Sequence, residues 1–224
     1  FEQAGYGFTF TTYDVRDDVF PESADACDAW IITGSKFSVC DKSPWMARLK
    51  DLILDIYDTG GPIVGICFGH QIVAEAFGAD VDRYPQGWGV GLHTYRLEKN
   101  VAELSALDGR FTLNAVHQDQ VLSKPEQADV IASSSFCPFA ALQYDDRILT
   151  LQTDGPLTEH GIAAFGLQVE RHTLQLWPTS HPDCAQRFNS IQCAGGGNQG
   201  DEHFTGPDAD SQSQVAQTGL ALQV

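Results

Sequence analysis

Basic side chains are scarce in this 224-residue sequence, which has 13 Lys and Arg residues against 30 Asp and Glu residues. The formal net charge of −17 repels phosphate backbones and anionic headgroups, so we expect no nucleic-acid partner and no membrane partner. Long apolar runs are also missing. None approaches the ~20 residues that are needed to cross a bilayer. No signal peptide is visible at the start of the sequence.

Disulfide and metal-binding patterns are missing as well. The sequence has six cysteines: Cys27, Cys40, Cys67, Cys137, Cys184 and Cys193. They show no CxxC spacing, and no Cys/His pair has the spacing of zinc ligands. Disulfide frameworks are typical of smaller secreted chains. We therefore expect a cytoplasmic protein with free thiols, and no metal or cofactor.

The sequence is long enough for one α/β domain. Apolar patterns predict strands at residues 8–15, 28–33, 62–66, 93–97, 111–115, 129–132 and 148–151. Helical spacing predicts helices over 44–57 and 71–77. This alternation predicts a three-layer α/β sandwich with a mostly parallel sheet and some antiparallel later strands. We expect residues 1–190 to form the domain and residues 191–224, rich in Gly, Asp, Ser and Gln, to be a disordered tail. Because the first residue is Phe1, we expect the chain to be a fragment.

The most informative segment is 61–71, Gly-Pro-Ile-Val-Gly-Ile-Cys-Phe-Gly-His-Gln. A short apolar strand leads into Cys67, Gly65 and Gly69 flank it, and a helical stretch follows at once. This is the layout of a nucleophile elbow, in which a reactive side chain lies on a tight strand-to-helix turn. Free N–H groups at a helix start favour the thiolate. The alternative is a buried core cysteine; the flanking glycines favour the nucleophile.

Segment 65–71 resembles the elbow of class I glutamine amidotransferases, most closely the GMP-synthase-like branch that includes the plant γ-glutamyl peptidases. Five other segments agree with this family in order: 27–35, 43–45, 86–91, 116–121 and 132–135. The resemblance covers roughly residues 8–152. It implies the flavodoxin-like fold of that family.

The resemblance also implies a mechanism. Cys67 would attack the side-chain amide of glutamine, or a γ-glutamyl amide, and form a thioester. The N–H of Phe68 and an N–H of the Gly34 loop would stabilise the oxyanion. The substrate-binding residues would be Gln71, Ser35 and His117. For His117 a second interpretation is a histidine that bonds only to neighbouring backbone, and His70 is expected to pack or cap.

One family motif is missing. A His-Pro-Glu triplet should follow strand 147–152, but Asp154, Gly155 and Pro156 occupy the aligned positions. An exposed carboxylate, with a pKa of about 4, is a poor base for a thiol. Either His181 supplies a displaced base with Asp183 as its orienter, or the protein is a degenerate amidotransferase. A third hypothesis is that a frameshift or splice error produced the lysine-free sequence after residue 152.

Several functions therefore stay open. A glutaminase would supply ammonia to a partner synthetase, whereas a γ-glutamyl peptidase would act on glutathione-type compounds. A pseudoenzyme or scaffold would use the fold without turnover. The intact elbow favours the first two functions, and the missing His-Pro-Glu favours the third.

Overall fold

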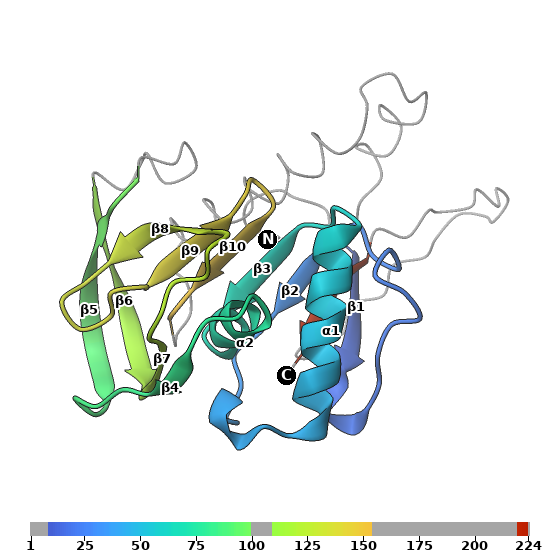
Figure 1. The fold of residues 1–224 in the computed structure, drawn as a ribbon, viewed down its shortest axis with the longest axis horizontal. Helices are drawn as coiled ribbons and strands as arrows, with labels where there is room; N and C mark the ends of the chain where they lie inside the picture. The colour runs from blue at the N-terminus through green and yellow to red at the C-terminus, as the bar shows by residue number, and fades with distance from the viewer. Residues whose placement is uncertain (1–8, 100–108, 154–218, 224) are drawn as a thin grey trace, which may run out of the picture.

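The computed structural model describes residues 9–99, 109–153 and, as backbone, 219–223 (Figure 1). Its strands are β1 (Thr9–Asp14), β2 (Trp30–Ile32), β3 (Ile63–Ile66), β4 (Val81–Arg83), β5 (Gly89–Leu97), β6 (Arg110–His117), β7 (Asp119–Val121), β8 (Ala128–Ser133), β9 (Ala141–Tyr144), β10 (Ile148–Leu151) and β11 (Gly219–Gln223). Its α-helices are α1 (Pro44–Asp58) and α2 (Phe68–Ala76), and its 3-10 helices are η2 (Val15–Asp17) and η3 (Val39–Asp41).

The large sheet is mixed. Its strand order is β1-β11-β2-β3-β10-β9-β8-β5-β6. The first five strands pair in parallel. The remaining neighbours, from β10 to β6, pair antiparallel, and this half curls away in Figure 1. A second, small sheet consists of antiparallel β4 and β7. The nucleophile segment thus lies in the parallel half, at the end of β3.

The predicted α/β fold is confirmed, with some differences in its elements. The seven predicted strands and the helix over 44–57 are present, and β2 is shorter than predicted. The second helix begins at Phe68 instead of residue 71. The sequence patterns missed β4, β7, β9 and β11. Of the predicted tail 191–224, the structure describes only β11, which lies between β1 and β2.

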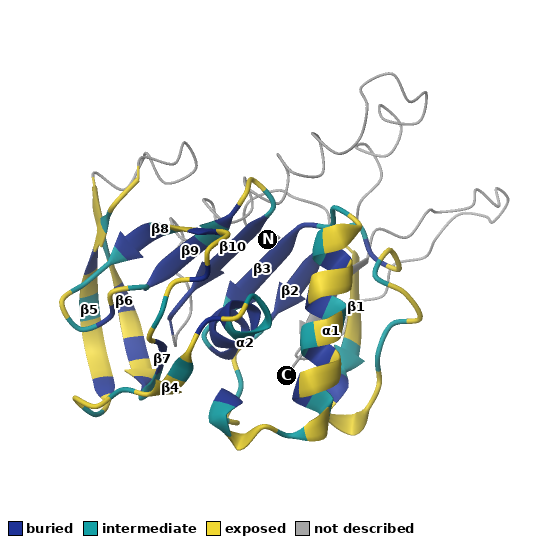
Figure 2. Cartoon of the chain, in the orientation of Figure 1, coloured by how far each residue is buried: buried dark blue, intermediate teal, exposed yellow. Residues whose placement is uncertain are grey.

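The two α-helices cover the same face of the sheet (Figure 1). Helix α1 starts with Pro44, as expected for a residue without an N–H, and buries an apolar stripe that includes Met46, Leu49 and Ile53. Its other side is exposed (Figure 2). Among the described residues no α-helix covers the other face (Figure 1), so the second helical layer stays a prediction. In the described part, no helix combines the length and apolar character that a membrane span needs.

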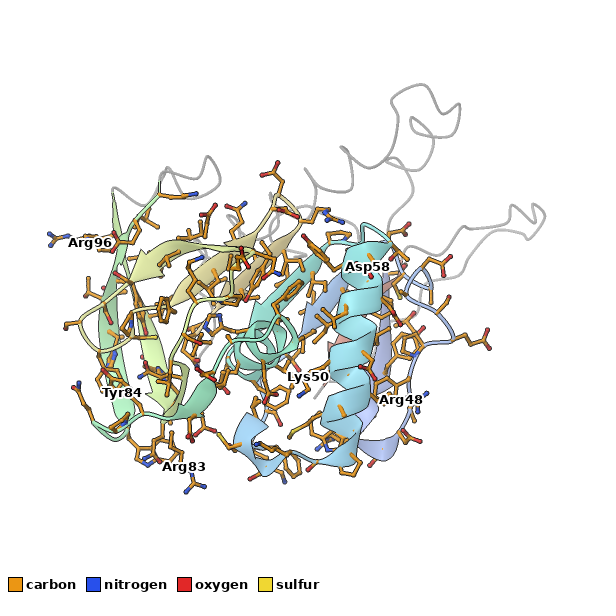
Figure 3. All side chains as sticks on the ribbon, viewed as in Figure 1. Arg48, Lys50, Asp58, Arg83, Tyr84 and Arg96 are labelled. Carbon is orange, nitrogen blue, oxygen red and sulfur yellow. The ribbon has the colours of Figure 1, made fainter. Side chains whose placement is uncertain are left out.

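Helix α2 lies beside α1 and packs on β2, β3 and β10 (Figure 1). All residues from Phe68 to Ala74 are buried. Lys50 on α1 points toward α2 (Figure 3), where its Nζ lies 3.1 Å from Glu75 Oε2. Side chains of β3 alternate between two core clusters, with Ile63 on the helix side and Val64 on the other. Both faces of β3 are therefore buried.

Candidate active site

Cys67 forms a strained elbow between β3 and α2. It follows the last residue of β3, precedes the first residue of α2, and has φ +53° and ψ −105°. A non-glycine residue in this region costs about 1–3 kcal/mol, so the surroundings must hold it. Cys67 N donates to Leu151 O at 2.9 Å, and Gln71 N donates to Cys67 O at 3.1 Å. Backbone bonds on both sides therefore fix the turn.

The two flanking glycines are required by close packing. A Cβ at Gly65 would lie 2.7 Å from Gly69 O and 2.8 Å from Thr150 Cγ2. A Cβ at Gly69 would overlap Ile32 O on β2. Helix α2 can therefore start directly after Cys67 only because both positions lack a side chain. This geometry agrees with the sequence interpretation, in which the glycines that flank Cys67 allow a tight strand-to-helix turn.

The predicted oxyanion residues lie next to the thiol. A Cβ at Gly34 would be 3.4 Å from Cys67 Cβ and 4.0 Å from Cys67 Sγ. Phe68 occupies the first position of α2, where backbone N–H groups have no partner within the helix. Its ring is buried and packs on Trp45, with centroids 5.7 Å apart. Ser35 Oγ accepts from Phe37 N at 3.1 Å, within the same loop as Gly34.

A network of glutamine amides ends at the thiol. Gln71 Nε2 donates to Asp119 O at 2.8 Å and to Gln152 Oε1 at 3.0 Å. Gln152 Nε2 in turn lies 3.9 Å from Cys67 Sγ. Gln71 and Gln152 are 4% and 1% exposed, so these bonds lie away from solvent. The predicted substrate residue Gln71 is thus also part of the structure around the nucleophile.

Gln152 was not among the residues that sequence reasoning selected. It follows β10, whose last residue Leu151 pairs with Ile66 in register. The next residue on each strand is Gln152 on one side and Cys67 on the other. Parallel pairing of segments 63–66 and 148–151 was the signal that could have found it. In the sequence alone, Gln152 is notable only as the residue that precedes the missing His-Pro-Glu by two positions.

His70 is a packing residue. It is completely buried, and its Nδ1 lies 2.8 Å from Thr150 Oγ1. Burial lowers the pKa of His70 from 6.5 to about 3; the charge of His117 acts in the same direction, and the Phe139 backbone opposes the shift. The ring is therefore neutral at pH 7. It agrees with the packing role expected for this position.

His117 lies at the end of β6 and is 4% exposed. Its Nδ1 lies 3.3 Å from Asp119 O, the carbonyl that also accepts from Gln71. Because a carbonyl only accepts, His117 Nδ1 carries the hydrogen. The ring also packs edge-on against Phe136, with centroids 6.2 Å apart. Asp119 O thus connects two of the predicted substrate residues, Gln71 and His117. The carboxylate of Asp119 accepts a hydrogen bond from Ser38 Oγ.

The predicted base, His181, and its orienter, Asp183, lie outside the described residues. One residue before the position where the family triplet would begin, Thr153 is buried and its Oγ1 donates to Asn114 O at 3.3 Å. Among the residues that the structure describes, no group of three His, Cys, Asp or Glu side chains could hold a metal ion. The described cysteines, namely Cys27, Cys40, Cys67 and Cys137, are free thiols.

Comparisons with known proteins identify the family. The model of the glutamine amidotransferase class-I family matches residues 3–153. The chain therefore belongs to the class-I glutamine amidotransferases. It is 33% identical over 150 residues to a glutamine amidotransferase-like protein of Schizosaccharomyces pombe, covering 64% of this chain and 59% of the relative. It is 28% identical over 154 residues to γ-glutamyl peptidase 3 of Arabidopsis thaliana, covering 65% and 62%.

Solved structures show the same fold. A Thermoplasma acidophilum protein, described as one of the subunits of a GMP synthase, has a TM-score of 0.62 at 18% identity, covering 76% of this chain and 96% of that one. The chain spans about 60% of the length of the two curated relatives named above. The resemblance inferred from the elbow and the ordered segments is confirmed by these matches.

Proposed function

We propose that this chain hydrolyses the side-chain amide of glutamine, or a γ-glutamyl amide, through a thioester on Cys67. One observation carries the proposal: Cys67 is held at positive φ, at the carboxyl end of a parallel strand, beside Gly34 and the start of α2. Ligand sites in open α/β sheets lie beyond the carboxyl ends of the strands. A strained nucleophile at this place is the arrangement of a nucleophile elbow, which serves acyl transfer.

The reaction follows from these positions. The thiolate attacks the amide carbon, and the N–H groups of Phe68 and the Gly34 loop stabilise the oxyanion. The C–N bond then breaks, and the leaving group, ammonia from glutamine or an amine from a γ-glutamyl amide, departs with a proton from the general acid. Water cleaves the thioester and releases the γ-carboxylate. Gln71, Ser35 and His117 are the proposed substrate contacts; His181, oriented by Asp183, is the proposed base.

Two alternatives have specific support. The similarity to a γ-glutamyl peptidase favours γ-glutamyl amides such as glutathione-type compounds as substrates. The absence of His-Pro-Glu after Gln152 favours a degenerate enzyme.

For a glutaminase, membership of the class-I glutamine amidotransferases favours an ammonia-accepting synthetase as partner. Free thiols in the described part favour a cytoplasmic, reducing location.

The test uses a chloroketone analogue of glutamine with the purified chain, followed by peptide mass spectrometry, an ammonia assay for glutamine and an assay of free glutamate for a γ-glutamyl amide. We expect labelling at Cys67, release of ammonia from glutamine or of glutamate and an amine from the γ-glutamyl amide, and loss of both labelling and turnover in Cys67→Ser. Labelling without turnover of either substrate would support the degenerate enzyme. No labelling at Cys67 would refute the proposal. His181→Ala with unchanged turnover would remove His181 as the base.

A further inference from the structure

The amide of Gln152 has one orientation, and a backbone carbonyl sets it. Asp119 O can only accept, so Gln71 must present its NH₂ group there. The second hydrogen of that NH₂ group points to Gln152, which must offer its oxygen. Gln152 Nε2 is therefore the atom that faces Cys67 Sγ, at 3.9 Å. A donor, and not an acceptor, lies against the thiol.

We propose that this relay, Asp119 O–Gln71–Gln152, stabilises the thiolate of Cys67. Gln152 is the catalytic donor, because it touches the reacting sulfur, and Gln71 is a positioning residue that acts through Gln152. The role of Gln152 in catalysis rests on the proposed function, whereas its effect on the ionisation of the Cys67 thiol does not. This role gives Gln71 a second task beside substrate binding.

The physical basis is the difference between a thiol and a thiolate as acceptors. Hydrogen bonds to a charged atom are roughly twice as strong as those between neutral groups, so a fixed N–H favours the ionised form. Gln71 and Gln152 are almost completely buried, which weakens competition from water. Because both amides are already bonded before substrate arrives, little reorganisation is needed when the charge forms.

Other ionisable groups lie on the elements around the elbow. Strands β2, β3 and β10 contain none. The ionisable residues nearest in the chain to the elbow and its contacts are His70 and Glu75 on α2, Lys36 after Gly34, His117 at the end of β6, and Asp119 on β7. The other described elements that contact α2 add Lys50 on α1, which pairs with Glu75, Cys40 and Asp41 on η3, and Asp82 and Arg83 on β4, among others. None of them is changed in the variants below. A difference between wild type and variant therefore isolates the amide relay.

The test is the pH dependence of alkylation of the full chain by iodoacetamide. The sulfur attacks the methylene carbon, an S–C bond forms and iodide leaves, and peptide mass spectrometry follows the modification of Cys67 alone. In Gln152→Met, which removes the donor at similar volume, we expect the pH midpoint to rise by about one unit. Below both midpoints the rate should fall only about threefold, because a less acidic thiol is a better nucleophile. The plateau at high pH should not fall.

The control variant is Gln143→Met, which changes a half-buried glutamine on β9 and should leave the midpoint unchanged. A variant that only restricted the access of iodoacetamide to the sulfur would lower the rate at high pH without moving the midpoint. The pH profile therefore distinguishes restricted access from a changed acidity of the thiol. Gln71→Met alters no atom that touches the sulfur and should raise the midpoint in the same direction. If Gln152→Met does not fold, Gln71→Met still decides the test.

An unmoved midpoint in either folded variant overturns the proposal. Alkylation needs no glutamine, so the result is independent of turnover. A raised midpoint in a chain that turns over neither glutamine nor a γ-glutamyl amide supports the relay and refutes the proposed function. An unmoved midpoint in a chain that turns over either substrate refutes the relay alone.

Discussion

Thr150 Oγ1 lies 2.8 Å from His70 Nδ1 in the interior between β10 and α2. The same hydroxyl donates its only hydrogen to Leu142 O at 3.4 Å, so it accepts from the imidazole. The imidazole of His70 on α2 is thus the donor, and its acceptor, Thr150, belongs to strand β10. This contact ties α2 to the sheet directly behind Cys67.

Removing that hydroxyl should destabilise the protein. In Thr150→Val the buried imidazole N–H loses its acceptor, and we expect a loss of about 2 kcal/mol in the free energy of unfolding, measured with urea. Thr94→Val is the control, since its hydroxyl contacts Thr112 on an exposed face and should change stability by less than about 0.5 kcal/mol. Equal stability of the two variants would mean that the hydroxyl is not the acceptor of His70.

His70 should also make stability depend on pH. Its pKa falls from 6.5 to about 3 on folding, so the unfolded chain binds one more proton between these values. The stability is fully present above pH 6.5 and is lost as the pH falls towards 3. The slope from this group is about 1.4 kcal/mol per pH unit.

The variant His70→Asn removes the titration and keeps an N–H donor for Thr150. Urea unfolding of both proteins at several pH values between about 4 and 6 should show a flatter dependence in the variant. The carboxylates titrate in both proteins and cancel in the comparison. Parallel curves would show that His70 does not take up a proton on unfolding.

Gly69→Ala should destabilise the elbow. The added Cβ would overlap Ile32 O, a backbone atom of β2 that cannot move alone, and we expect a cost of about 3 kcal/mol. Gly87→Ala is the control, because a Cβ there meets no atom within 4 Å and only the positive φ of +90° is strained. That strain costs about 1–2 kcal/mol. Calorimetric melting of the two variants measures the difference, and a Gly69→Ala protein at least as stable as the control would contradict the packing argument.

Gln120→Met should stabilise the protein. Gln120 is fully buried on β7, and neither its Oε1 nor its Nε2 forms a hydrogen bond with a described residue. Replacing an unsatisfied amide by a thioether of similar volume should raise the free energy of unfolding by about 1 kcal/mol. Gln86→Met, at an exposed position, should change it by less than about 0.5 kcal/mol. A destabilised Gln120→Met would indicate that the amide has a partner.

Local patterns predicted the elements that repeat apolar residues over several positions, such as α1 and β10. They failed where tertiary contacts decide the structure. Helix α2 starts at Phe68 because Gly69 fits against Ile32 O, although Gly has low helix propensity. The strands β4 and β7 are three residues long, carry polar side chains and are stabilised by pairing with each other.

The site shows the same division. Cys67 was found from its flanking glycines, because both lie within the same short segment of the sequence. Gln152 and the carbonyl of Asp119 were not found, because their roles depend on the register of β10 against β3 and on the path of the chain after β6. No local pattern contains either relation. A register prediction for parallel strands would have found the first of them.

The position of β11 sets an order of assembly. Thr9 of β1 pairs with Gly219, and Leu222 of β11 pairs with Ile32 of β2, so within the described strands β1 joins the sheet only through β11. During synthesis β1 is made before β11, with residues 15–218 between them, so β1 lacks this neighbour until β11 has been made. Closing such a long interval is slow. The parallel half of the sheet is therefore completed late, when β11 pairs with β1 and β2.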